Sequence, residues 1–321
     1  MEYAIHEIYD LLSKGTWNKS DREQVSPEPL PSYVCSLFSE LAYYHIPQWE
    51  IDDRKRVKLI PCRAYQTLAA AGRRTRAPNI DSRRFVIEDR GTIVLGNLLN
   101  RNLFIAYRGT QFLFDWKVNS RARLVPLPAR GWHEEWGCGQ VHSGFLEEAI
   151  RVSARILYEI RDYDFEHVFL TGHSLGGAVA ALSETFLRRR LGSDASIYIF
   201  GAPKYCDISE YAARLFGHIP TQFRRSGDLV PTVPPVSGYA DHPYEFGTDC
   251  APYIDSNLYP EALKEVLAFN AFRSWGKFWA SQFERHSIEG YRTDLGIRLG
   301  AVGAKLPLAP VEKLTYEDVE R

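Results

Sequence analysis

The feature that most constrains this chain is the stretch HVFLTGHSLGGA at residues 167–178. Its first five residues form a short apolar run typical of a buried strand, and a Leu- and Ala-rich segment typical of a helix follows from residue 175 to about residue 191. Between the two lies a G-x-S-x-G pentapeptide centred on Ser174. Glycine on both sides lets the backbone pass close to itself. The stretch therefore predicts a strand, a tight turn that presents the Ser174 hydroxyl, and a helix directly behind it.

Apolar runs and helical patterns alternate along much of the chain. Strands are predicted at 85–88, 92–95, 103–107, 195–200 and 221–225, and helices at 145–163 and 209–215. The first strands suggest a hairpin that opens a sheet. Alternation of strand and helix favours an α/β fold, in which a largely parallel sheet carries helices on both faces.

The amino-terminal part of the chain is polar and rich in proline. Residues 26–31 read SPEPLP, and each proline favours an extended backbone at the residue before it. We therefore expect residues 1–31 to form an arm, and Ser32 to cap a helix that runs to about residue 45. The length of 321 residues and the hydrophobic share of 45% fit one α/β domain over residues 32–321.

Composition argues against several classes of function. Thirty-nine basic and forty acidic residues give a net charge of −1, which offers no field for holding a polyanion, so no nucleic acid partner is expected. Five cysteines without a CxxC pair indicate neither a disulfide framework nor a zinc ribbon. The amino terminus lacks a basic segment followed by an apolar core, and no window reaches the ~18 apolar residues of a membrane span. We expect a cytoplasmic location, with export independent of a signal peptide left open.

A serine nucleophile needs a histidine base and a carboxylate that orients it. Where the serine lies in a G-x-S-x-G turn between a strand and a helix, the aspartate follows it in the sequence and the histidine follows the aspartate. Asp228 lies just beyond the predicted strand 221–225, at the strand edge that also carries Ser174. His286 is the preferred base over His242, because fourteen residues after Asp228 is a short excursion for a loop that must return over the serine. The other aspartates considered do not directly follow a clear strand: Asp207, Asp241 and Asp249.

Two further groups are expected beside the nucleophile. The amide of Leu175 opens the helix behind Ser174 and provides one donor to a developing oxyanion. A second donor is predicted at Thr110, where Gly109 permits a tight turn after the strand 103–107. His173, next to Ser174 in sequence, is expected to point away from the hydroxyl and to act as packing or hydrogen-bond support.

Together these motifs resemble the class 3 lipase family, the fungal-type triacylglycerol lipases and their bacterial and plant relatives. The similar segments are 107–110 with Asp115 and Trp116, 141–145, 171–177, 200–203, 228–231 with Pro234 and Pro235, and His286 and Ser287 with Tyr291. They run from about residue 85 to residue 295 in the family's order.

The resemblance implies an α/β-hydrolase fold and a set of site residues. These are the triad Ser174, Asp228 and His286, the oxyanion hole of Thr110 and Leu175, and His142 in support of the site. It also implies a serine hydrolase that cleaves carboxylic ester bonds of lipids through an acyl-enzyme, without a cofactor. Two alternatives stay open: a catalytically silent module that binds a lipid or a protein, and a phospholipase with the same triad. Head-group preference, acyl-chain preference and oligomeric state are left open.

Two aromatic segments are candidates for contact with the substrate. In the resembling family a lid helix follows the oxyanion residue, and here residues 111–118 offer apolar surface, with Phe112 and Trp116 expected to contact substrate. The amphipathic segment 263–279 has aromatic residues at helical spacing, so it forms either part of the core or an acyl-binding wall that touches a lipid interface transiently.

No metal site is predicted. An H-E-x-x-H zinc motif would begin at His133, but Gly137 stands where the second histidine is required.

Overall fold

A computed structural model describes the central part of the chain and several flanking segments. The described residues are 27–43, 48–51, 57–60, 82–99, 101–109, 123–127, 139–192, 195–214, 219–234, 237–253 and 284–301. Within them, none of the helices has the length and apolar character that crossing a bilayer requires.

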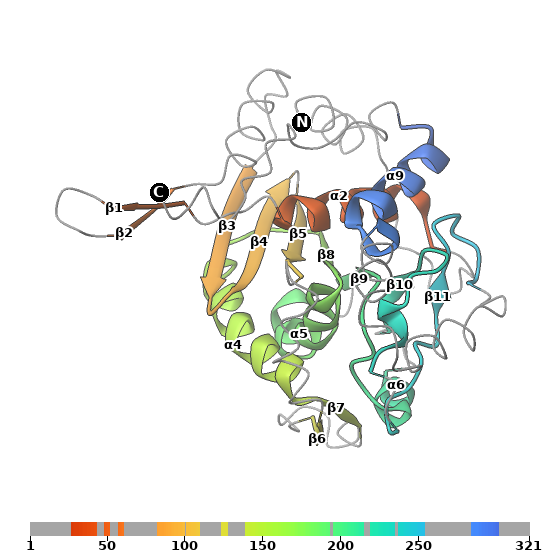
Figure 1. Cartoon of the computed structure of the whole chain (residues 1–321). Coiled ribbons are helices and arrows are strands. Elements are labelled where there is room, and N and C mark those ends of the chain that lie inside the picture. The colour runs from red at the N-terminus through yellow and green to blue at the C-terminus, as the bar shows by residue number, and fades with distance from the viewer. Residues whose placement is uncertain are drawn as a thin grey trace.

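The centre of the fold is a seven-stranded sheet with the strand order β11-β10-β9-β8-β5-β4-β3 (Figure 1). Its strands are β3 (Ser82–Asp89), β4 (Thr92–Leu99), β5 (Asn102–Tyr107), β8 (His167–His173), β9 (Ala195–Phe200), β10 (Thr221–Phe223) and β11 (Glu245–Phe246). The three at one edge, β3, β4 and β5, are antiparallel, and every pair from β5 to β11 is parallel. The predicted α/β fold with a largely parallel sheet is confirmed, and so is the hairpin that opens it.

Helices cover both faces of this sheet because its central strands are apolar on both sides. Along β5, Phe104 and Ala106 join a core with helices α2 (Pro29–Tyr43) and α9 (Ile288–Leu299). The alternate residues of β5 join a second core with α4 (Ser143–Glu159) and α5 (Leu175–Leu191). This alternation follows from the period of two along a strand. Figure 1 shows α2 and α9 side by side, away from α4 and α5.

Smaller elements complete the described structure. They are the hairpin of β1 (Gln48–Ile51) and β2 (Val57–Ile60), the pair of β6 (Leu124–Pro126) and β7 (Gln140–His142), the short helix α6 (Ile208–Ala213) and the 3-10 turn η2 (Val230–Thr232). The sequence pattern did not predict β1, β2, β6 or β7.

The predicted start of the first helix is wrong. Helix α2 begins at Pro29, so Ser32 lies in its first turn and is not its cap. The Ser32 hydroxyl donates to the carbonyl of Glu28 at 2.6 Å instead. Prolines suit this place, because the first turn of a helix needs no amide donors. The helix crosses the boundary expected at residue 31, while the extent of the domain stays a prediction.

A buried ion pair joins the two helices on one face of the sheet. Arg292 Nε on α9 donates to Glu40 Oε2 on α2, and both side chains are almost completely shielded from solvent. The pair ties α2 to the helix that directly follows His286.

The parallel strands place the candidate site. Residues after β8, β9 and β10 all leave the sheet at its carboxyl edge, as in other parallel α/β sheets. Ser174 follows β8, Gly201 follows β9, and Asp228 lies five residues after the end of β10.

Candidate active site

Ser174 lies on the tight turn that the sequence predicts. Its φ of 58° and ψ of −134° are rare for a residue with a side chain, and such backbone strain is typical of functional turns. The flanking glycines are required sterically. A Cβ at Gly172 would lie 2.4 Å from the carbonyl oxygen of Gly176, and a Cβ at Gly176 would lie 2.3 Å from that of Tyr107. The amide of Ser174 donates to the carbonyl of Phe200 at 2.9 Å, which anchors the turn to β9.

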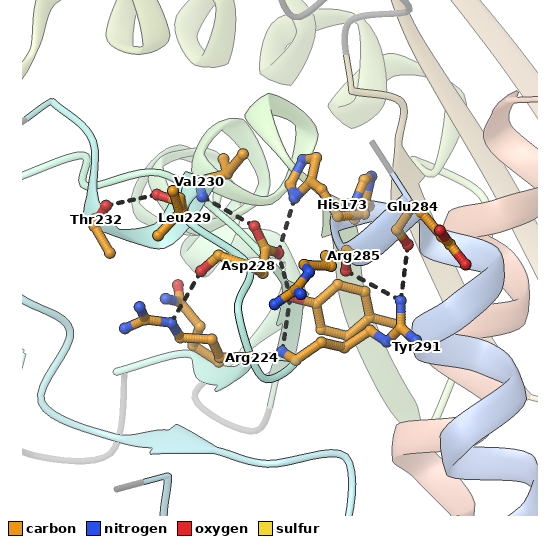
Figure 2. A network of polar contacts seen from close by, with 12 residues as sticks. His173, Arg224, Asp228, Leu229, Val230, Thr232, Glu284, Arg285 and Tyr291 are labelled. Atoms are coloured by element: carbon orange, nitrogen blue, oxygen red, sulfur yellow. Dashed lines mark hydrogen bonds and ion pairs between the residues drawn. The ribbon is translucent and has the colours of Figure 1, made fainter. Parts of the chain in front are cut away.

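Asp228 is completely buried and is held by three partners (Figure 2). Its Oδ1 accepts a hydrogen bond from the amide of Val230 at 2.9 Å. Its Oδ2 accepts from the Tyr291 hydroxyl at 2.6 Å and lies 2.9 Å from His286 Nδ1. A carboxylate held in this way orients an imidazole and stabilises it when it gains a proton.

His286 is buried and presents one nitrogen without a partner. Because Nδ1 donates to Asp228, the basic nitrogen is Nε2. In the described part of the chain no hydrogen bond reaches Nε2, from the Ser174 hydroxyl or from any other group. The ring nevertheless lies beside the nucleophile turn. Its centroid is 4.4 Å from that of His173, and a Cβ on Gly201 would lie 3.0 Å from its Cε1.

His173 makes supporting hydrogen bonds, as expected, and one of its partners is the backbone of His286. Its Nε2 lies 2.6 Å from the carbonyl oxygen of His286, and its Nδ1 lies 2.7 Å from the Tyr43 hydroxyl. A carbonyl can only accept, so Nε2 carries the proton and Nδ1 accepts from Tyr43. Burial, with a smaller contribution from His286, lowers the pKa of His173 well below its usual value. The ring is therefore neutral and links α2 to the backbone of His286.

The other two predicted histidines have separate roles. His142 caps α4: its Nδ1 accepts from the amides of Gly144 at 3.1 Å and Phe145 at 3.4 Å, and burial lowers its pKa to about 4. His242, the rival base, packs its ring 5.2 Å from that of Tyr211, and burial lowers its pKa to about 3. The imidazole that pairs with Asp228 is that of His286.

Part of the predicted site lies outside the described residues. This applies to Thr110, Phe112, Trp116, the proposed lid at 111–118 and the segment 263–279. Their roles stay predictions, as does that of Leu175. Leu175 does begin α5 directly behind Ser174. Gly109 also brings the chain close, since a Cβ on it would lie 3.1 Å from Ser174 Cβ.

Two residues that contact the triad were not predicted from the sequence. Tyr291 belongs to a motif that resembles the family, but no role was predicted for it, and Arg225 was not predicted as a site residue. The five-residue spacing from His286 to Tyr291 is a weak signal by itself. Arg225 carries no signal, because an arginine after a strand is common on protein surfaces.

Part of this chain is similar in sequence to known lipases and phospholipases. Residues 104–238 match the family model described as Lipase (class 3), an interval that contains Ser174 and Asp228 and ends before His286. The secreted mono- and diacylglycerol lipase 1 of Fusarium solani is 35% identical over 174 residues, which cover 50% of this chain and 48% of that protein. Phospholipase A1-II 1 of Oryza sativa subsp. indica is 27% identical over 53% of this chain and 48% of that protein.

Among solved structures, the lipase from Rhizopus microsporus var. chinensis is 22% identical, with a TM-score of 0.47, and covers 72% of this chain and 80% of that one. The chain spans about half the length of the curated relatives it matches. Residues 104–238 of this chain are therefore similar to the class 3 lipase family.

Proposed function

We propose that this protein is a serine hydrolase that cleaves carboxylic ester bonds of lipids. The observation that carries the proposal is the buried pair of His286 Nδ1 and Asp228 Oδ2 at 2.9 Å, beside the strained turn of Ser174. Surface ion pairs are common, but a fully buried carboxylate that orients an imidazole next to a serine on a strained turn is typical of nucleophilic catalysis.

In the first half of the reaction, Ser174 Oγ attacks the carbonyl carbon of the ester while its proton passes to His286 Nε2. Asp228 stabilises the resulting imidazolium. Negative charge on the carbonyl oxygen is met by the amide of Leu175 at the start of α5 and by Thr110. The tetrahedral intermediate then collapses, the imidazolium protonates the leaving alcohol, and the acyl group remains on Ser174.

In the second half, His286 Nε2 takes a proton from water, and the resulting hydroxide attacks the acyl-enzyme carbonyl. The same two donors stabilise the oxyanion. Collapse releases the fatty acid and returns the proton to Ser174 Oγ. His286 therefore acts as base and then as acid in each half.

Relatives support a lipid ester as the substrate. The Fusarium solani relative is named as a mono- and diacylglycerol lipase, and the Oryza sativa relative as a phospholipase A1. Both chemistries need the same triad, so the head group of the substrate is a separate question. It is addressed by comparing hydrolysis of diacylglycerol with that of phosphatidylcholine by the same preparation, together with p-nitrophenyl esters of increasing chain length.

The test of the proposed function is covalent labelling. A fluorophosphonate probe should label the wild-type protein and should not label Ser174→Ala, while Asp228→Ala and His286→Ala should react far more slowly. Ester turnover by Ser174→Ala should fall at least about a thousandfold. Failure of the wild type to label would refute the proposal and favour the silent binding module.

A further inference from the structure

One arginine outside the triad holds the backbone on which His286 is mounted. Arg225 Nη1 donates to the carbonyls of Glu284 at 2.9 Å and Arg285 at 3.1 Å, the two residues directly before His286. Its Nε forms an ion pair at 2.9 Å with Asp294 Oδ2 on α9. A single guanidinium therefore connects the strand side of the site to both flanks of the histidine.

The backbone of Arg225 contacts the other half of the pair. Its amide donates to the Tyr291 hydroxyl at 3.1 Å, and that hydroxyl donates to Asp228 Oδ2 at 2.6 Å. Arg225 thus reaches the carboxylate through Tyr291 and the imidazole through the chain before His286.

A glycine on α9 leaves the space that this guanidinium occupies. A Cβ at Gly290 would lie 2.1 Å from Arg225 Nη1 and 2.5 Å from its Cζ. Glycine inside a helix costs about 1 kcal/mol relative to alanine. The close approach of Arg225 accounts for its presence in the first turn of α9.

We propose that Arg225 is a positioning residue that fixes His286 between Asp228 and Ser174. The proposal rests on the proposed function. Its physical basis is the geometry of the contacts: Nε and Nη1 form a rigid fork that bonds a carboxylate and two carbonyls at once, which a lysine cannot reproduce. The ion pair adds little stability of its own, because the two side chains are 23% and 37% exposed. The contacts of Arg225 instead fix the position of the His286 imidazole. A displacement of a catalytic group by about 1 Å costs roughly 100-fold in rate.

Three variants and one matched control test the proposal. Arg225→Ala removes the side-chain contacts and keeps the backbone hydrogen bond to Tyr291. Arg225→Lys keeps the charge, and Gly290→Ala displaces the guanidinium while favouring the helix. The control is Arg190→Ala, since Arg190 Nη2 likewise donates to carbonyls of a turn, those of Ile160 and Tyr163, at the far end of α5.

On a soluble p-nitrophenyl ester, we expect kcat of Arg225→Ala and Gly290→Ala to fall about 10- to 100-fold, with KM within about twofold of wild type. Arg225→Lys should recover only part of the loss. Arg190→Ala should keep the kcat of the wild type, even though we expect it to lose as much thermal stability as Arg225→Ala. The proposal is wrong if Arg225→Ala retains kcat within about twofold, or if Arg190→Ala loses as much kcat.

A second readout requires no turnover. The proton that His286 Nδ1 shares with Asp228 should give a downfield resonance in the proton NMR spectrum, identified by its loss in Asp228→Asn. It should broaden and exchange faster with water in Arg225→Ala and Gly290→Ala, and stay unchanged in Arg190→Ala. An unchanged resonance in the two site variants would overturn the positioning role. If the wild type fails to label with fluorophosphonate, the proposed function fails, while this resonance still decides the role of Arg225.

Discussion

The Tyr291 hydroxyl and the carboxylate of Asp228 meet at 2.6 Å, on the same oxygen that faces His286. Tyr291 lies in α9, five residues after the histidine, so one short segment provides both partners of Asp228 Oδ2. Burial, together with the charge of Asp228, raises the pKa of Tyr291 well above its ordinary value, and the hydroxyl therefore remains a donor. The α9 helix is thus a structural part of the candidate site.

Removing this hydroxyl should slow the reaction. Tyr291→Phe leaves the ring in place and deprives the buried carboxylate of one donor, and a hydrogen bond to a charged group contributes ~1.5–3 kcal/mol. We expect kcat/KM for ester hydrolysis to fall about 10- to 100-fold. Tyr158→Phe is the control, since Tyr158 is 64% exposed on α4. Equal activity of the two variants would show that the contact does not support catalysis.

The buried ion pair of Glu40 and Arg292 should dominate the stability of the α2 and α9 face. Glu40→Ala removes the carboxylate that pairs with the buried Arg292 guanidinium, and breaking a buried ion pair in this way typically costs about 3–5 kcal/mol. The double variant Glu40→Leu with Arg292→Met should lose less, because no charge remains buried. Unfolding in urea measures both. Glu166→Gln provides a comparison, since its ion pair with Arg101 is half-exposed and contributes about 0–1 kcal/mol. A Glu40→Ala loss no larger than this would contradict the expectation.

Stability should fall in mild acid because of buried neutral histidines. The pKa of His142 is lowered from 6.5 to about 4 in the folded protein, so below pH 6.5 the unfolded state binds a proton that the folded state does not. The part of the stability that depends on neutral His142 is fully present above pH 6.5. It is lost at up to ~1.4 kcal/mol per pH unit as the pH falls to about 4. His142→Asn keeps a capping side chain and should reduce this slope in urea unfolding measured from pH 7.5 to pH 4.5. An unchanged slope would exclude His142 as a source.

Alanine at Gly176 should abolish the nucleophile turn. Its Cβ would lie 2.3 Å from the Tyr107 carbonyl, which belongs to a buried strand and cannot move cheaply. We expect fluorophosphonate labelling to disappear and the protein to lose roughly 3 kcal/mol or more of stability. Gly192→Ala is the comparison, because its Cβ meets no atom within 4 Å and carries only the strain of a φ of +77°. Labelling of Gly176→Ala at the wild-type rate would contradict this account of the turn.

Local pattern predicted some elements well and others poorly. The helix expected at 175–191 matches α5, because the preceding turn and the basic residues at its end mark both boundaries. The strand expected at 221–225 ends already at Phe223. For α2, capping preference predicted Ser32 as the N-cap, and the prolines predicted an extended backbone up to residue 31. The helix starts earlier, at Pro29, because its packing against the sheet outweighs both preferences.

The sequence by itself determined the strand, turn and helix around Ser174, since glycines and apolar residues close together in the chain dictate that local geometry. It also determined the order of the candidate carboxylate and imidazole. Only the tertiary structure decided that Asp228 and His286, 58 residues apart, lie 2.9 Å from each other, and that Tyr291, Arg225 and His173 hold them. Such contacts depend on how β8, β10 and α9 pack, and packing joins residues whose separation along the chain carries no signal.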